Sequence, residues 1–217
     1  MTTVLFDMDG IILEGPRTDP QVYAAAADEA LAKLEADPTP AQRRDLRRHG
    51  IDSVRERCRE LELDPDRFWA LKEAAASEHT HERIRSGERG VYDDIDAIAA
   101  LADRTTVGLV SNNRHRTAEF VADSLPIEFD VVRGRDPTFE GFRRRKPDSY
   151  YIDDALSKLG VDDGLHVGDS PKDVVAGRAA GLETAFVRRS HNRLLDRPEG
   201  TTYELGSLIE LHDLVEP

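Results

Sequence analysis

The hydrophobic pattern begins with a short continuous run at residues 4–6, which ends abruptly at Asp7, Asp9 and Gly10. A brief apolar run bounded by acids and glycine is typical of a buried strand. Ligands of α/β proteins bind beyond the carboxyl ends of parallel strands, so both carboxylates would face one crevice. Adjacent carboxylates repel each other, and a divalent cation such as Mg²⁺ removes that repulsion. The alternative is an ordinary strand end with two solvated acids.

Residues 19–87 show a different pattern, because their apolar positions recur at helical spacing and no strand is evident. A further helix is expected to begin near Ile51. Three pairs place a capping residue directly before a proline, as helix starts do: Asp19-Pro20, Thr39-Pro40 and Asp64-Pro65. The pattern therefore predicts a helical block inserted after the first strand.

From residue 88 onward, strand-like and helix-like segments alternate, which predicts βαβ units and a mostly parallel sheet. The expected strands are 105–110, 129–132, 165–167 and 184–187. The expected helices are 93–102, 117–125, 147–159 and 174–180. The predicted fold class is thus α/β, with one sheet domain and one smaller helical domain.

The composition argues against several classes of partner. With 217 residues, 39% of them hydrophobic, the chain is long enough for one ordinary domain and a smaller one. A net charge of -13 argues against a nucleic-acid partner, because phosphates need a positive surface. No apolar run approaches a membrane span and no leader pattern is evident, so we expect a cytoplasmic protein without a membrane partner. The single Cys58 excludes an internal disulfide and is expected to be a buried small hydrophobe.

The charged residues are unevenly chosen, since 25 Arg accompany only 5 Lys and 25 of the 43 acidic residues are Asp. An acidic, lysine-poor surface is expected of a halophilic protein that works in concentrated salt, where self-repulsion is screened. A GC-rich genome that favours arginine codons accounts for the same skew. Loss of the fold in dilute buffer and its recovery in molar KCl would support the halophilic interpretation.

Polar residues follow three of the predicted strands, and a lysine stands at the start of a following helix. In a parallel sheet these side chains can face one crevice. They supply what phosphoryl transfer requires: carboxylates for a metal, a second acid, a hydroxyl and an amide for phosphate oxygens, and a fixed cation. Each has an ordinary explanation alone, and their joint occurrence carries the prediction. The residues are Asp7, Asp9, Ser111, Asn112, Lys146, Asp169 and Ser170.

These residues resemble the four motifs of the haloacid dehalogenase (HAD) superfamily, in its phosphatase branch with a helical cap, and phosphoglycolate-type phosphatases look most similar. Asp7-Met8-Asp9-Gly10-Ile11 matches the first motif, Ser111 the second, Lys146 the third and Gly168-Asp169-Ser170-Pro171-Lys172-Asp173 the fourth. The resemblance covers nearly the whole chain. It implies a Rossmann-like doubly wound parallel sheet made by 1–14 and 88–217, with a small α-helical cap domain inserted at 15–87.

The resemblance also implies catalytic and metal-binding roles. Asp7 would be the nucleophile that forms an aspartyl-phosphate. Asp9 would protonate the leaving group and then activate water. Mg²⁺ would be held by Asp7, by the backbone carbonyl of Asp9 and by Asp169. Asp173, one helical turn beyond Asp169, would lie outside the metal ligands and orient a metal-bound water or Lys146.

The remaining matching residues would bind the phosphoryl group. Ser111 and the amide of Asn112 would hold phosphoryl oxygens, and Lys146 would stabilise their charge and that of Asp7. His166 lies inside a predicted strand and is expected to be a packed histidine.

The implied function is Mg²⁺-dependent hydrolysis of a small phosphomonoester, such as phosphoglycolate or a sugar phosphate, with the cap selecting the substrate. Asp9 argues against dehalogenation, since halide leaves without a proton. A phosphomutase shares every motif and remains an alternative. A non-enzymatic phosphate-binding or signalling protein is the alternative from a different class, although Asp7 and Asp169 are both intact. The sequence leaves the physiological substrate and the oligomeric state open.

Overall fold

The computed structural model describes residues 3–48 and 50–215. Contacts within this part divide the chain into two compact units. The α/β unit comprises residues up to 17, residues 89–135 and residues from 144 onward. The helical unit comprises 18–88 and 136–143. The chain therefore passes between the units four times, at 17/18, 88/89, 135/136 and 143/144.

The α/β unit is built on a parallel sheet of six strands in the order β3-β2-β1-β4-β5-β6. β1 lies between β2 and β4, and its register pairs Phe6 with Leu109 of β2 and with Val167 of β4. The strands are β1 Thr3–Phe6, β2 Thr106–Arg114, β3 Val131–Arg135, β4 Leu165–Gly168, β5 Glu183–Val187 and β6 Tyr203–Leu205. The central strand thus ends beside the end of β4, while β2 continues past it to Arg114.

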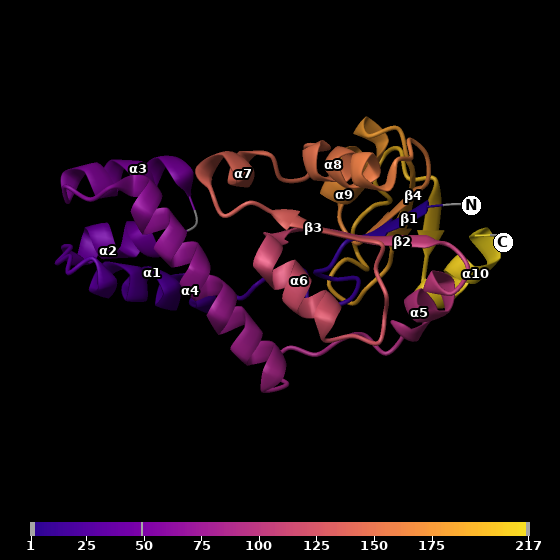
Figure 1. The fold of residues 1–217 in the computed structure, drawn as a ribbon, viewed down its shortest axis with the longest axis horizontal. Coiled ribbons are helices and arrows are strands. Elements are labelled where there is room, and N and C mark those ends of the chain that lie inside the picture. The colour runs from indigo at the N-terminus through magenta and orange to yellow at the C-terminus, as the bar shows by residue number, and fades with distance from the viewer. Residues whose placement is uncertain (1–2, 49, 216–217) are drawn as a thin grey trace. The chain divides into compact units, whose positions relative to one another are not determined.

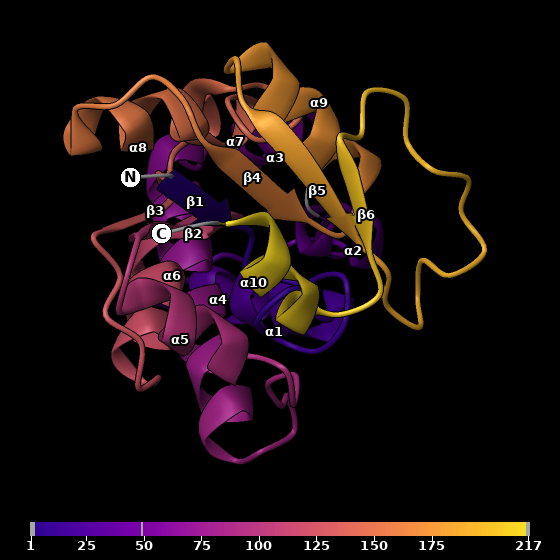
Figure 2. The same cartoon turned by 90° about the vertical axis from the view of Figure 1, so that its right-hand side faces the viewer.

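Helices cover both faces of this sheet (Figure 1). Figure 2 shows α8 and α9 on one face and α5, α6 and α10 on the other. The helices of this unit are α5 Asp96–Ala102, α6 His115–Asp123, α8 Tyr150–Leu159, α9 Pro171–Ala179, the 3₁₀ turn η1 Leu208–Glu210 and α10 Leu211–Leu214. All four residues of β1 are buried, which explains the continuous apolar run in the sequence. The predicted doubly wound α/β fold is confirmed.

The helical unit begins with four helices whose starts the sequence signalled. They are α1 Pro20–Lys33, α2 Pro40–Arg47, α3 Ile51–Glu60 and α4 Pro65–Arg85. The Asp19 side chain accepts a hydrogen bond from the backbone of Gln21, and Thr39 forms a capping box with Gln42. Asp64 caps α4 in the same way as Asp19 caps α1. Each cap stabilises its helix by about 1 kcal/mol, so the predicted helix starts are confirmed for a physical reason.

A further helix of this unit comes from a distant part of the chain. α7, Phe139–Arg143, follows β3 and packs against Trp69 of α4. The Trp69 ring centroid lies 4.6 Å from that of Phe139 and 5.3 Å, edge-on, from that of Phe142. Cys58 is buried in the same apolar cluster, as predicted. From the sequence, all of 88–217 was assigned to the sheet domain. Residues 136–143 instead group with the helices, because the rings of Phe139 and Phe142 are buried against Trp69.

Other departures from the predicted elements are small. β2 continues past residue 110 to Arg114, so Ser111 and Asn112 lie within the strand. β6 was not predicted, because this three-residue edge strand is only partly buried and pairs with β5 alone. Across 3–48 and 50–215, no helix combines the length and the apolar character that crossing a bilayer requires.

Candidate active site

Three strands bring the predicted residues to one edge of the sheet. Asp7 directly follows β1, and its backbone amide donates to the carbonyl of Val167 at 2.8 Å. Asp169 directly follows β4, and Ser111 lies in the last part of β2. Since β1 lies between β2 and β4, these polar groups meet at the carboxyl end of the sheet, where ligands of such folds bind.

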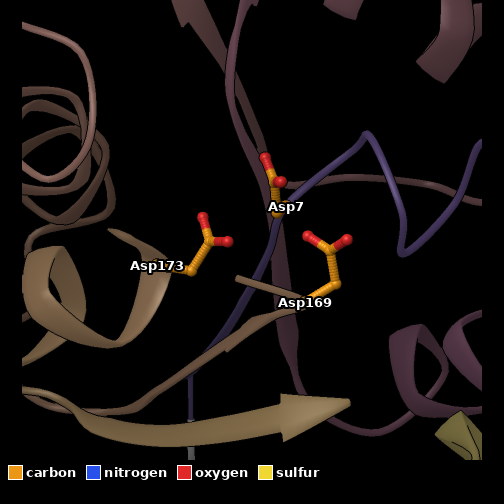
Figure 3. Close-up of side chains that lie close together, drawn as sticks. All are labelled: Asp7, Asp169 and Asp173. Carbon is orange, nitrogen blue, oxygen red and sulfur yellow. The ribbon is translucent and has the colours of Figure 1, made fainter. Parts of the chain in front are cut away.

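Asp7, Asp169 and Asp173 form a buried carboxylate cluster (Figure 3). One oxygen of each lies within 4.8 Å of an oxygen of the other two. The exposed fractions of these residues are only 3%, 3% and 1%. Asp7 and Asp169 come from strand ends, whereas Asp173 lies in the first turn of α9. Carboxylate oxygens gathered in this way are the ligands that hard divalent cations prefer.

Lys146 places a positive charge against this cluster. Its Nζ donates to Asp7 Oδ1 at 2.8 Å and to the Val110 carbonyl at 3.0 Å, and it lies 2.8 Å from Asp173 Oδ1. The side chain of Asn112 fixes the Lys146 backbone, because its Oδ1 accepts from the amide at 2.8 Å and its Nδ2 donates to the carbonyl at 3.0 Å. The structure therefore joins two predicted residues through a contact that the motifs did not indicate.

Both carboxylate oxygens of Asp173 are occupied by protein groups. Oδ1 faces Lys146, and Oδ2 accepts from the backbone amide of Ser170 at 3.1 Å and from its hydroxyl at 2.5 Å. His166 is buried in β4, as predicted, with Nδ1 3.1 Å from the Leu5 carbonyl and Nε2 3.9 Å from Asp173. These contacts give Asp173 the geometry of a residue that positions Lys146 and the start of α9.

Two glycines allow the carboxylates to lie this close to the backbone. Gly10 has φ +86°, and a Cβ at this position would lie 2.0 Å from Asp169 Oδ2. A Cβ at Gly168 would lie 2.2 Å from Asp173 Cβ. A larger residue at either position would displace a carboxylate, which is a physical reason for the glycines in the first and fourth motifs.

The cluster buries more negative than positive charge. Burial, together with Asp7 and Asp173, raises the pKa of Asp169 from 3.8 to about 8. Burial also raises the pKa of Asp7 to about 6, although Lys146 opposes this. For Asp173 burial acts in the same direction, but the Lys146 ammonium outweighs it and lowers the pKa. A bound divalent cation would relieve both the desolvation and the repulsion, so the residues present fit such an ion.

The Asp9 carboxylate lies outside this cluster. Its Oδ1 pairs with Nη2 of Arg89 at 2.7 Å, and its Oδ2 accepts from Nδ2 of Asn113 at 3.2 Å. The metal role predicted for Asp9 uses only its backbone carbonyl, so these side-chain contacts are compatible with it. They also show that the side chain is held by two residues that no motif contains.

Ser111 is 1% exposed, and its hydroxyl oxygen accepts a hydrogen bond from the backbone amide of Asn113 at 3.0 Å. A hydroxyl that accepts can still donate its own hydrogen. The bond therefore fixes the oxygen without using the hydrogen that a phosphate would need.

Sequence reasoning missed the loop that follows β5. His191 Nε2 lies 2.5 Å from Asp169 Oδ2, and Asn192 Nδ2 donates to the carbonyls of Asp169 at 2.7 Å and Val187 at 2.9 Å. Figure 2 shows the long connection between β5 and β6 that carries these residues. No local pattern links His191 to Asp169, because only the pairing of β4 with β5 brings them together.

Comparison with known proteins gives the same picture. A family model described as haloacid dehalogenase-like hydrolase matches residues 1–181. The N-acetylmuramic acid 6-phosphate phosphatase of Pseudomonas aeruginosa is 29% identical over 205 residues, which cover 91% of this chain and 86% of that protein.

Solved structures share the fold. CbbY from Rhodobacter sphaeroides, in complex with phosphate, superposes with a TM-score of 0.66 at 22% identity and covers 97% of this chain and 96% of its own. A HAD phosphatase from Thermococcus onnurineus gives a TM-score of 0.58 at 22% identity, with 99% and 97% covered. The segment matched by the family model contains every motif position from Asp7 to Asp173. The chain therefore belongs to the haloacid dehalogenase-like hydrolase family, and the prediction that it is an enzyme of this family is confirmed.

Proposed function

We propose that this hydrolase removes phosphate from a small phosphomonoester, with Mg²⁺ bound and with Asp7 as the nucleophile. The observation that carries the proposal is the buried group of Asp7, Asp169 and Lys146, in which two carboxylates and an ammonium lie together. Phosphoryl transfer depends mainly on such positioning and charge compensation. Two of the similar proteins named above are phosphatases, which supports the same reaction.

Mg²⁺ would be held by the side chains of Asp7 and Asp169 and by the backbone carbonyl of Asp9. These are oxygen ligands, and Mg²⁺ prefers oxygen. When bound, the ion would neutralise the carboxylates and polarise the phosphoryl oxygens. Asp173 would stay paired with Lys146.

In the first half of the reaction, a carboxylate oxygen of Asp7 would attack phosphorus, and the bond from phosphorus to the leaving oxygen would break. Asp9 would give its proton to that oxygen, so the product would leave as an alcohol. In the second half, water would attack the phosphorus of the aspartyl-phosphate while Asp9 takes a proton from it. The bond between Asp7 and phosphorus would then break, which restores the Asp7 carboxylate, releases inorganic phosphate and leaves Asp9 protonated.

The phosphoryl oxygens would be bound by Ser111, Asn112 and Lys146. The Ser111 hydroxyl would donate its hydrogen, and the backbone amide of Asn112 would donate beside it. The Asn112 side chain holds the Lys146 backbone in place. Asn112 would therefore both bind a phosphoryl oxygen through its backbone amide and position Lys146 through its side chain. The Lys146 ammonium would stabilise the charge that spreads over the phosphoryl oxygens.

We infer that the substrate is a sugar phosphate or a compact phosphorylated acid such as phosphoglycolate. The Pseudomonas relative is named for a phosphorylated amino-sugar acid. A CbbY variant from Rhodobacter sphaeroides was crystallised with xylulose bisphosphate. The partner expected for this chain is therefore a small phosphorylated metabolite.

The test is phosphate release from a panel of phosphomonoesters, with and without Mg²⁺, at low and high KCl. We expect metal-dependent release that is strongest on one ester, and Asp7→Asn should lower it by several orders of magnitude. Asp123→Asn changes an exposed aspartate of the same unit and should leave the rate unchanged. Undiminished release by Asp7→Asn would show that another residue is the nucleophile. Transfer of phosphate between two positions of one sugar, without release, would identify a phosphomutase.

A further inference from the structure

Arg89 holds the carboxylate that is assigned the proton transfers. Its Nη2 lies 2.7 Å from Asp9 Oδ1, and the two side chains are only 12% and 14% exposed. Solvent and salt therefore screen this pair weakly. Asn113 donates a hydrogen bond to Oδ2 at 3.2 Å, so the Asp9 carboxylate contacts Arg89 through an ion pair at one oxygen and Asn113 through a hydrogen bond at the other.

The same guanidinium binds the chain segments that lead to and from the helical unit. Its Nε donates to the carbonyl of Glu14 at 3.0 Å, and its Nη2 donates to that of Gly15 at 3.2 Å. The backbone amide of Glu14 donates to the carbonyl of Gly90 at 2.9 Å, so the two segments also pair directly. Arg89 is the first residue of the α/β unit after the chain returns from the helices. One side chain thus joins Asp9 to both segments.

A second arginine of the α/β unit, Arg189, has a structural role and serves as a comparison. Arg189 donates to the carbonyls of Gly10 and Ile11 and forms a paired contact with both oxygens of Asp94. All of its guanidinium nitrogens have acceptors. In contrast, Nη1 of Arg89 is buried and has no hydrogen-bond partner among the described residues. Buried donors without a partner are few in native structures, so this nitrogen distinguishes Arg89 from Arg189.

We propose that Arg89 is a positioning residue for the proton transfers of Asp9. Asp9 must reach the leaving oxygen in one step and a water in the next, and each transfer needs hydrogen-bond distance. The bonds to Glu14 and Gly15 fix the plane of the guanidinium, and the guanidinium in turn fixes the carboxylate. This role rests on the phosphatase function proposed above.

Arg89→Met separates this role from general damage through its dependence on the leaving group. For an alkyl phosphomonoester, kcat/KM should fall by about 10–100-fold, because the alkoxide needs a proton. For p-nitrophenyl phosphate, whose leaving group departs without a proton, formation of the aspartyl-phosphate should be nearly unchanged and only its hydrolysis should slow. The variant should therefore show a burst of p-nitrophenol that is larger than in the wild type. Equal losses on both substrates, without a larger burst, would overturn the proposal.

Two further variants serve as controls. Arg83→Met removes an arginine of the helical unit that pairs with Asp19 at 2.9 Å and Glu88 at 3.2 Å, so it should leave the rates on both substrates unaffected. Arg89→Lys keeps a cation but cannot make the forked contacts, and it should recover part of the activity on the alkyl ester. Circular dichroism spectra establish that each variant is folded.

A double-mutant cycle with Asp9→Asn completes the test, with p-nitrophenyl phosphate as the substrate. If Arg89 acts through Asp9, Arg89→Met should lower turnover in the wild-type background and have no further effect in the Asp9→Asn background. The same loss in both backgrounds would overturn the proposal. A wild-type enzyme that releases no phosphate from any ester would overturn the proposed function and this role with it, whereas an active wild type with an unaffected Arg89→Met would overturn the role alone.

Discussion

The two units differ in the side chains that dominate their interiors. In the α/β unit several carboxylates and an ammonium are buried together, with Asp7 and Lys146 each 3% exposed. In the helical unit the main cluster is aromatic and aliphatic, with Trp69 packed on Phe139, although Lys72 of α4 is also buried. Burying charges carries a desolvation penalty that only well-placed partners offset, whereas burying rings is favourable by itself. We therefore expect the α/β unit to depend on a bound cation and the helical unit to depend on packing.

A buried lysine in each unit sharpens this comparison. Lys72 of α4 is fully buried, and its Nζ donates to the carbonyls of Leu46 and Arg48, both at 2.7 Å. Burial lowers the pKa of Lys72 from 10.5 to about 8. Burial acts in the same direction on Lys146, but Asp173 and Asp7 outweigh it and raise the pKa. The pKa values of the two buried lysines shift in opposite directions, because carboxylates compensate an ammonium charge and neutral carbonyls do so only weakly.

Lys146→Met should have the largest effect, because it leaves Asp7 and Asp173 without their ammonium partner. Turnover should fall by several orders of magnitude, and the metal-free protein should lose about 3–5 kcal/mol of unfolding free energy. Phosphate release measures the turnover, and urea unfolding with and without Mg²⁺ measures the stability. Lys158→Met removes a half-exposed lysine of the same unit and should change stability by less than about 1 kcal/mol. A Lys146→Met protein as stable as the wild type would contradict the importance of buried charge.

Trp69→Ala should destabilise the helical unit by about 3–5 kcal/mol, since it removes the ring that packs on Phe139 and Phe142. Mg²⁺ should raise the stability of this variant and of the wild type equally. Thermal unfolding followed by circular dichroism, with and without Mg²⁺, tests this. Trp69→Phe keeps an aromatic ring and should lose less unfolding free energy than Trp69→Ala. If Mg²⁺ selectively rescued Trp69→Ala, the distinction between the two interiors would fail.

The stabilisation that Mg²⁺ gives should increase with pH. The folded-state pKa of Asp169 is about 8, above its ordinary 3.8, so the folded protein holds a proton that the unfolded chain has lost. The stabilisation that comes from this extra proton is fully present below pH 4 and disappears as the pH rises through 8. The unfolding free energy of the metal-free protein should therefore fall over that range. Mg²⁺ requires the ionised carboxylate, so its affinity should rise by about tenfold per pH unit between pH 6 and 8. Calorimetric titration measures the Mg²⁺ affinity, and an affinity that does not change with pH would contradict the expectation.

The smallest predicted effect concerns Lys72, whose folded-state pKa of about 8 lies below its ordinary 10.5. Between these values the unfolded chain holds more protons, so the unfolding free energy of the helical unit should rise with pH, by at most about 1.4 kcal/mol per pH unit. Trp69, the only tryptophan, reports unfolding by fluorescence and has the Lys72 ammonium 6.0 Å from its ring centroid. Lys72→Met should abolish the rise and Lys33→Met, which changes an exposed lysine, should retain it. A rise that persists in Lys72→Met would assign it to another group.

The sequence was sufficient for those features that one local rule determines. Asp7 and Asp169 follow apolar runs that read as strands, and parallel topology then brings them together without further information. The helix starts at Asp19, Thr39 and Asp64 were readable because a cap and a proline act within a few residues. Most elements and the parallel sheet, apart from α7 and β6, could therefore be predicted before any contact was known.

The remaining features depend on contacts between residues far apart in the chain. Arg89 and His191 touch Asp9 and Asp169 across long sequence separations, and an arginine or histidine in a polar segment carries no sign of its partner. Phe139 shows the same difficulty for the fold, since an apolar side chain carries no sign that Trp69 packs against it. Such partners become visible only when the tertiary structure is known.

The placement of α7 has a consequence for protein engineering. The simplest design for a chimaera between related enzymes would move the helical unit as one continuous segment. In this chain the helical unit is a composite of 18–88 and 136–143, and the second piece ends three residues before Lys146. A chimaera that transfers 18–88 alone would leave Trp69 without its aromatic partners, so a functional graft must carry both pieces and rejoin the chain immediately ahead of the lysine.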